Sequence, residues 1–93
     1  KVTMISANAA NGNESITTLT INKNITAINA KCFYKCKNLK KIRIKAKGIV
    51  NMNNKAFAGI HSKAVFYTYE SQKTRYRAML KTAGVKKPTI KRL

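Results

Sequence analysis

Acidic residues are almost absent from this 93-residue sequence. It contains two carboxylates, Glu14 and Glu70, against 20 lysines and arginines, and its formal net charge is +18. With two acids and one histidine, His61, no set of nucleophile, base and orienting group can be assembled, and the sequence is not expected to be an enzyme. The excess of positive charge predicts attraction to polyanions, but it carries no information about the fold.

Cysteines and long apolar runs are scarce as well. Two cysteines are too few for a disulfide-stapled miniature fold. A zinc site needs about four nitrogen or sulfur ligands, and the chain offers Cys32, Cys36 and the distant His61. The spacing C-x-x-x-C also differs from the C-x-x-C of thiol redox pairs. No apolar run approaches the ~20 residues that span a bilayer, so we expect no metal, no cofactor and no membrane span.

Apolar residues, in contrast, are plentiful and recur at a fixed period. They make up 44% of the chain, which argues against a disordered basic tail. Adding 23 to the apolar positions of residues 2–21, and then 24 to those of residues 25–44, lands mostly on apolar positions again. A unit this short cannot bury its own apolar face, so its stability has to come from stacking on neighbouring units.

The spacing within one unit predicts its geometry. Leu39, Ile42 and Ile44 follow the L-x-x-L-x-L pattern of a leucine-rich repeat. Alternation at Ile42 and Ile44 predicts a strand with one buried face. A second short extended segment is expected at Ile25-x-x-Ile28, followed by a short helical turn.

These slots define the expected interior. Cys32 shares its slot with alanines of the other repeats and Cys36 shares its slot with Ile60, so we interpret both as buried thiols rather than as a chemical site. The residues assigned to the interior are Ile25, Ile28, Cys32, Phe33, Cys36, Leu39, Ile42, Ile44, Met52, Phe57 and Ile60.

Residues 25–44, ITAINAKCFYKCKNLKKIRI, resemble the BspA-type leucine-rich repeat, whose pattern is close to I-x-x-I-x-x-x-A-F-x-x-C-x-x-L-x-x-I-x-I. Cys36 falls on the cysteine of that pattern, and Cys32 replaces its alanine. Residues 56–85 resemble the closing coil and C-terminal helix of bacterial surface proteins built from such repeats, so the resemblance covers roughly residues 2–85. It implies a secreted or cell-surface protein that takes part in adhesion, with the repeats as a binding scaffold that has no catalytic residues.

A helix is expected over residues 71–84. Ser71 is suited to its N-cap and Gly84 to a left-handed C-cap. One apolar stripe runs along it at helical spacing: Tyr76, Met79, Leu80 and Ala83. This helix should cover the open end of the stack, where a strand edge and apolar surface would otherwise be exposed.

The predicted fold is therefore a single α/β leucine-rich-repeat solenoid over residues 1–93, made mostly of short strands in about 3.5 coils of 23–24 residues. The coils lie at about 1–22, 23–45 and 46–69, the capping helix follows, and residues 85–93 form a basic tail. Because the chain begins with Lys1 rather than Met, we expect a piece of a longer protein. Because a capping helix follows the last coil, we expect this piece to be the C-terminal end of an array that continues into further N-terminal repeats.

The outward side of the strands supplies a candidate ligand-binding face. If Ile42 and Ile44 point inward, the basic residues between and after them point outward. If Phe66 also points inward, two tyrosines join them, whereas a register slip of one residue would reverse this strand. The candidate face comprises Lys41, Arg43, Lys45, Tyr67 and Tyr69. The competing interpretation is that the lysines only keep strand edges soluble.

The leading functional hypothesis is a non-enzymatic ligand-binding or adhesion module of an exported bacterial surface protein. Its ligand would be an extracellular protein or an anionic glycan, bound to the basic and aromatic face. One alternative is a repeat region that targets a larger exported enzyme. Another is a polyanion-binding domain for nucleic acid or glycan; nucleic-acid binding would be non-specific, because no helix-turn-helix, RRM, KH or zinc-finger signature is present.

Overall fold

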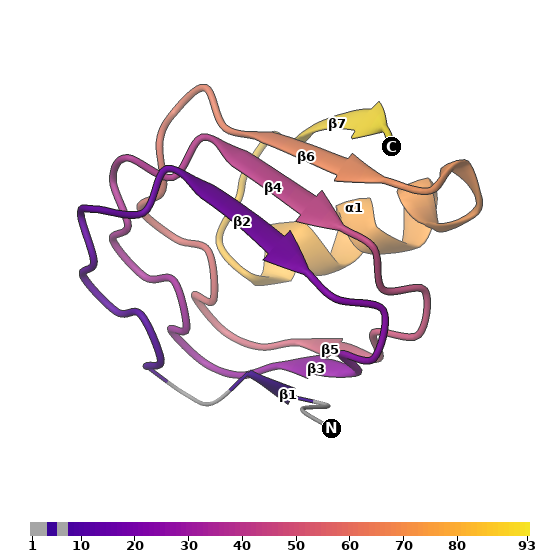
Figure 1. Ribbon diagram of the computed structural model, residues 1–93, viewed down its shortest axis with the longest axis horizontal. Coiled ribbons are helices and arrows are strands. Elements are labelled where there is room, and N and C mark those ends of the chain that lie inside the picture. The colour runs from indigo at the N-terminus through magenta and orange to yellow at the C-terminus, as the bar shows by residue number, and fades with distance from the viewer. Residues whose placement is uncertain (1–3, 6–7) are drawn as a thin grey trace.

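Two parallel sheets and one α-helix make up the computed structural model, which describes residues 4–5 and 8–93 (Figure 1). The smaller sheet contains β1 (Met4–Ile5), β3 (Ala27–Ile28) and β5 (Asn51–Met52). The larger sheet contains β2 (Thr18–Ile21), β4 (Lys41–Ile44), β6 (Val65–Thr68) and β7 (Thr89–Arg92). A 3-10 turn, η1 (Glu70–Gln72), leads into α1 (Lys73–Thr82).

The repeat period of the sequence is the offset between neighbouring strands. In the larger sheet Lys41 lies opposite Thr18 on one side and opposite Val65 on the other, which gives offsets of 23 and then 24 residues. The smaller sheet follows the same offsets, because Ala27 pairs with Met4 and with Asn51. Each repeat therefore contributes one strand to each sheet, and successive repeats stack through parallel ladders.

Apolar side chains of the two sheets meet in one core. Ten of the eleven residues assigned to the interior are buried, and Ile60 packs against the core with part of its surface exposed. Aromatic rings continue the stack from repeat to repeat. The ring centroids of Phe33 and Phe57 are 5.4 Å apart and nearly parallel, and Phe57 meets Phe66 edge-on at 5.5 Å.

Both cysteines belong to this core. Cys32 and Cys36 have no exposed surface, and their Sγ atoms lie 2.9 Å from the carbonyl oxygen of Asn29 and 3.0 Å from that of Ala10, respectively. Burial raises the pKa of each thiol above its usual value, which keeps both protonated near neutral pH. They act as small apolar side chains whose S–H groups satisfy backbone carbonyls.

The segment after the smaller sheet is a turn with left-handed backbone rather than the short helical turn expected from the sequence. Two positions in each repeat have positive φ, between 56° and 79°. The first is held by Asn8, Lys31 and Lys55, and the second by Gly12, Lys35 and Gly59. This conformation lets the turns hydrogen-bond to one another: Phe33 N–H donates to Ala56 O and Lys35 N–H to Ala58 O, both at 2.8 Å.

Repeats approach closely at the second of these positions. A Cβ atom placed on Gly59 would lie 3.1 Å from the Cα of Lys35, with its own φ at +79°. Both the contact and the backbone conformation favour glycine there.

The start of the capping helix differs from the sequence expectation. Ser71 lies in η1 rather than at the N-cap, and Gln72 occupies the N-cap without a side-chain hydrogen bond to the backbone. The N–H groups in the first turn of α1 are therefore not capped by a side-chain hydroxyl, as they would be with serine at the N-cap.

The end of the helix follows the expectation at Gly84, whose φ is +103°. Val85 N–H donates to Leu80 O at 2.9 Å and Gly84 N–H donates to Lys81 O at 3.2 Å. This pair of bonds is the Schellman motif, which satisfies carbonyls that the helix leaves without partners.

The helix α1 closes the C-terminal end of the stack and contacts β5 (Figure 1). Tyr76 is fully buried, and its Oη donates to Ala46 O at 2.7 Å and accepts from Ile49 N–H at 3.3 Å. The Arg75 guanidinium donates to the carbonyls of Lys47 and Ile49. The helix is thus held by hydrogen bonds to the segment between β4 and β5 as well as by apolar contact.

Residues 85–93 are more than the basic tail that the sequence suggests. Within them β7 pairs in parallel with β6, placing Ile90 opposite Phe66, and Ile90 is 9% exposed. The pairing provides partners for the backbone N–H and C=O groups at the edge of β6. A strand therefore completes this end of the larger sheet, and the helix α1 covers the core beneath it.

Candidate functional site

The outward side of the larger sheet brings the candidate residues together. On β4, Ile42 and Ile44 are fully buried, while Lys41 and Arg43, which alternate with them, are exposed. Lys45 follows the strand, and its N–H donates to Ile21 O at 2.9 Å, so the ladder continues through it. Lys45 is exposed as well.

The register of β6 is the one that places its tyrosines outward. Phe66 is fully buried, and Tyr67 and Tyr69 are half-buried on the opposite side. We call the outward side of the larger sheet, with Lys41, Arg43, Lys45, Tyr67 and Tyr69, the basic-aromatic face.

Side chains on this face form rows that cross the strands. One row consists of Thr20, Arg43, Tyr67 and Lys91, which lie opposite one another on β2, β4, β6 and β7. Sequence reasoning missed Lys91 because it assigned no strand to residues 89–92. The signal was available: Ile90 lies 24 residues after Phe66, so the period continues for one more strand.

Lys45, Tyr69 and Leu93 each follow the last residue of their strands, β4, β6 and β7. Leu93 N–H donates to Thr68 O at 3.0 Å, which extends the β6–β7 ladder, and Leu93 is 41% exposed. Lys47 was also missed, and its Nζ lies 4.7 Å from the centroid of the Tyr69 ring. Tyr69 therefore offers an aromatic ring beside a cation just past the end of β6.

The electrostatics of the face are one-sided. Lys41 Nζ lies 6.0 Å from the Tyr67 ring centroid, and cations attracted to a ring in this way also remain available to an anion. In residues 4–5 and 8–93 the one ion pair is Lys37 with Glu14, at 3.4 Å and well exposed. Within that described part, no carboxylate neutralises the basic residues of the face.

A smaller basic and aromatic cluster lies on a turn. The Nζ atoms of Lys31 and Lys35 lie 5.4 Å and 5.3 Å from the centroid of the half-buried Tyr34 ring. These residues belong to the left-handed turn after β3 and therefore lie off the basic-aromatic face.

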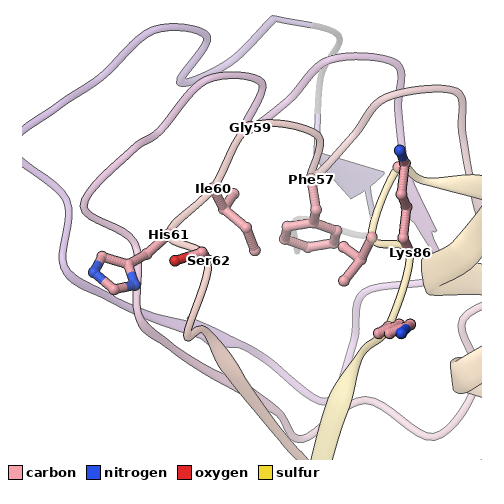
Figure 2. Close-up of a pocket in the computed structure, with 9 residues that line it drawn as sticks. Phe57, Gly59, Ile60, His61, Ser62 and Lys86 are labelled. Carbon is pink, nitrogen blue, oxygen red and sulfur yellow. The ribbon is translucent and has the colours of Figure 1, made fainter.

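A pocket of about 420 Å³ lies between residues 57–62 and residues 84–87 (Figure 2). Figure 2 shows Phe57 and Ile60 lying toward each other, while the ring of His61 extends away from them. His61 Nδ1 accepts a hydrogen bond from Lys63 N–H at 3.0 Å. The pocket floor is thus mainly apolar, and His61 is engaged in its own turn.

Two other kinds of site can be assessed from the described residues. Among residues 4–5 and 8–93, no group of three histidine, cysteine or acidic side chains is placed to hold a metal ion. Over the same part of the chain, no helix is long and apolar enough to cross a membrane.

Comparison with known proteins agrees with the repeat geometry. The family model described as BspA type leucine rich repeat region, in six copies, matches residues 1–91. No curated protein and no solved structure matches the chain.

Proposed function

This chain belongs to the BspA-type leucine-rich repeat family, and from that premise we propose that it is a non-enzymatic binding and adhesion module of an exported bacterial surface protein. The family implies a repeat module for protein interaction or adhesion. In this proposal the stacked repeats are a short solenoid, and the basic-aromatic face is its ligand surface.

One observation carries the proposal: exposed cations and half-buried tyrosines are in register on one side of a rigid sheet. Arg43 and Tyr67 are direct neighbours across β4 and β6, and the inward residues beside them are fully buried. A site built on strands is held more firmly than one built on loops, so its ligand would pay little of the cost of ordering it.

The composition supports a binding role over catalysis. Acid–base chemistry needs titratable groups that converge on a reacting atom. The chain has one histidine and two carboxylates, and Glu14 is paired with Lys37 at an exposed position. The ligand that such a surface suits is an anionic glycan or an acidic patch of an extracellular protein, with non-specific attraction to nucleic acid at low salt.

A salt titration of binding tests the proposal. The protein is offered heparin, isolated bacterial wall polysaccharide, duplex DNA and an extracellular-matrix protein such as fibronectin, from low to physiological salt. A variant that combines Lys41→Ser, Arg43→Ser and Lys45→Ser is compared with the parent protein. We expect at least one glycan or the matrix protein to stay bound at physiological salt and to be lost in the variant.

The matched control removes the same charge from elsewhere. It combines Lys63→Ser and Lys81→Ser with Lys55→Asn, because Asn8 holds the left-handed slot of Lys55 in the first repeat. All three lysines are exposed and lie off the basic-aromatic face. If both triple variants lose every ligand in parallel, binding follows net charge alone and the proposal is wrong.

A further inference from the structure

We propose that the ligand of the basic-aromatic face is a linear glycan with carboxylates on alternate sugars, lying across the strands along the row Arg43–Tyr67–Lys91. This inference rests on the proposed function, because it specifies what the same face binds. It adds a residue, Lys91, that enters the face only because β7 pairs with β6.

The geometry of the row comes first. Arg43 and Lys91 are the direct cross-strand neighbours of Tyr67, one on each side. Neighbouring strands are about 4.8 Å apart, so the backbones that carry the two cations are separated by about 10 Å, with the aromatic ring between them. A ligand along the row therefore meets a cation, a ring and a second cation in turn.

That order matches a glycan in which a charged sugar alternates with a neutral one. A neutral pyranose packs its C–H face against an aromatic ring, and Tyr67 is half-buried, so its position is fixed before binding. The acidic sugars on either side then lie over Arg43 and Lys91. The planar guanidinium of Arg43 suits a carboxylate, which it can bind with two parallel hydrogen bonds.

Nothing on the face competes for these cations. In the part of the chain that the structure describes, the single ion pair joins Lys37 and Glu14, away from this row. Lys41, with its Nζ 6.0 Å from the Tyr67 ring, adds a further positive charge at the edge of the same position. Among the described residues, no carboxylate forms an ion pair with the cations of this row.

Single-stranded nucleic acid fits this arrangement less well. It needs a basic track along one side for its phosphates and a separate line of rings on which successive bases stack. Here the cations lie on both sides of Tyr67 and in line with it. The face is also the surface of a sheet, and the pocket between residues 57–62 and 84–87 lies elsewhere.

The test uses three defined probes at physiological salt. A hyaluronan decasaccharide carries a carboxylate on every second sugar, a heparin decasaccharide carries charge on nearly every sugar, and a single-stranded oligothymidylate stands for nucleic acid. Titration calorimetry compares the parent protein with Lys91→Ser, Arg43→Ser and Tyr67→Leu. Lys81→Ser, an exposed lysine of α1, is the matched single-charge control.

We expect Lys91→Ser and Arg43→Ser each to weaken hyaluronan binding about tenfold, and Lys81→Ser to weaken it less than about twofold. Tyr67→Leu keeps an apolar side chain but removes the ring, and it should weaken hyaluronan more than heparin. Lys91 is exposed on the last strand, so its replacement tests the site without disturbing the core.

Three results would overturn the inference. The first is an equal effect of Lys91→Ser and Lys81→Ser on hyaluronan. The second is the expected pattern of variants with heparin or oligothymidylate while hyaluronan does not bind. The third is a protein ligand that depends on Lys41, Arg43 and Lys45 when no glycan binds at physiological salt. That last result would leave the proposed function standing and show that only the ligand class is wrong.

Discussion

The first repeat, at the N-terminal end of the stack, buries its residues less completely than the second repeat, which has a neighbour on each side. Leu19 and Ile42 are in register on β2 and β4, yet Leu19 is partly exposed and Ile42 is fully buried. The same holds for Ile16 and Leu39, which occupy one slot in consecutive repeats: Ile16 is partly exposed and Leu39 is not.

The C-terminal end is closed by the helix α1 and by one further strand, β7. Tyr76, Leu80 and Ala83 of the helix region are fully buried against the last repeat, and β7 pairs with the edge of β6. The comparison teaches that an apolar side chain in a given position of the repeat is fully buried only when another element packs on each side of its repeat. Stability in the described residues should therefore be concentrated toward the C-terminal end.

The largest effect should come from truncating the same slot in an interior repeat and in the first repeat. Ile42→Ala should lower the free energy of unfolding by about 3–4 kcal/mol, because it leaves a cavity in a fully buried position. Leu19→Ala should cost about 1–2 kcal/mol, since part of its surface is already in water. Urea unfolding of both variants measures the difference, and equal losses would show that the first repeat is packed as well as the second.

The next effect concerns the junction of helix and repeat. Gly84→Ala should cost about 2–4 kcal/mol, because φ is +103° and the new Cβ would lie 2.6 Å from the Cβ of Ala58. Gly48→Ala is the matched control, since Gly48 has no positive φ and no atom within 4 Å of its added Cβ. Thermal unfolding should separate the two variants, and similar melting temperatures would contradict this view of the junction.

A smaller loss is expected when only the hydrogen bonds of the cap are cut. Tyr76→Phe keeps the buried ring but leaves Ala46 O and Ile49 N–H without the hydroxyl, which should cost about 1–3 kcal/mol. Hydrogen exchange at Ile49 should accelerate more than exchange in β2. A uniform change along the chain would mean that the hydrogen bonds of the Tyr76 hydroxyl do not act locally.

The smallest expected change is a gain. In the described residues, Thr68 Oγ1 is the one buried side-chain oxygen or nitrogen without a hydrogen-bond partner. Thr68→Val should raise the free energy of unfolding by about 1 kcal/mol, because it replaces an unsatisfied hydroxyl with a methyl group of similar size. Thr89→Val, at an exposed position, is the control and should leave stability nearly unchanged. A loss on Thr68→Val would point to a partner for the hydroxyl.

Local sequence was enough for the features that repeat. Ile42 and Phe66 could be assigned to the same inward position because they are one repeat period, 24 residues, apart in the sequence. Since Phe66 is buried, the next residue, Tyr67, faces outward. Gly84 was recognisable because a left-handed helix end favours glycine for a local, steric reason.

Features that depend on contacts between distant segments were harder to predict. The segment Thr89–Arg92 is short and half of it is charged, so its strand pairing depends on the edge that β6 offers rather than on its own propensity. Lys91 and Lys47 were missed for the same reason. The position of Lys91 on the face follows from the register of β7 with β6, and the position of Lys47 near Tyr69 follows from the path of the loop between β4 and β5. Ser71 was misassigned because η1 starts the helical segment one residue before it.

The close approach of Gly59 to Lys35 sets a rule for the order in which these units can follow one another. In that slot the chain alternates glycine, lysine and glycine, and a side chain on Gly59 would meet the backbone of Lys35 at 3.1 Å. A tandem copy of the second unit would set lysine against lysine, and a contact this close would require the neighbouring turn to shift by a few tenths of an ångström. A redesigned array that duplicates one unit would therefore have to relieve this contact, whereas an alternating pair of units keeps glycine beside lysine.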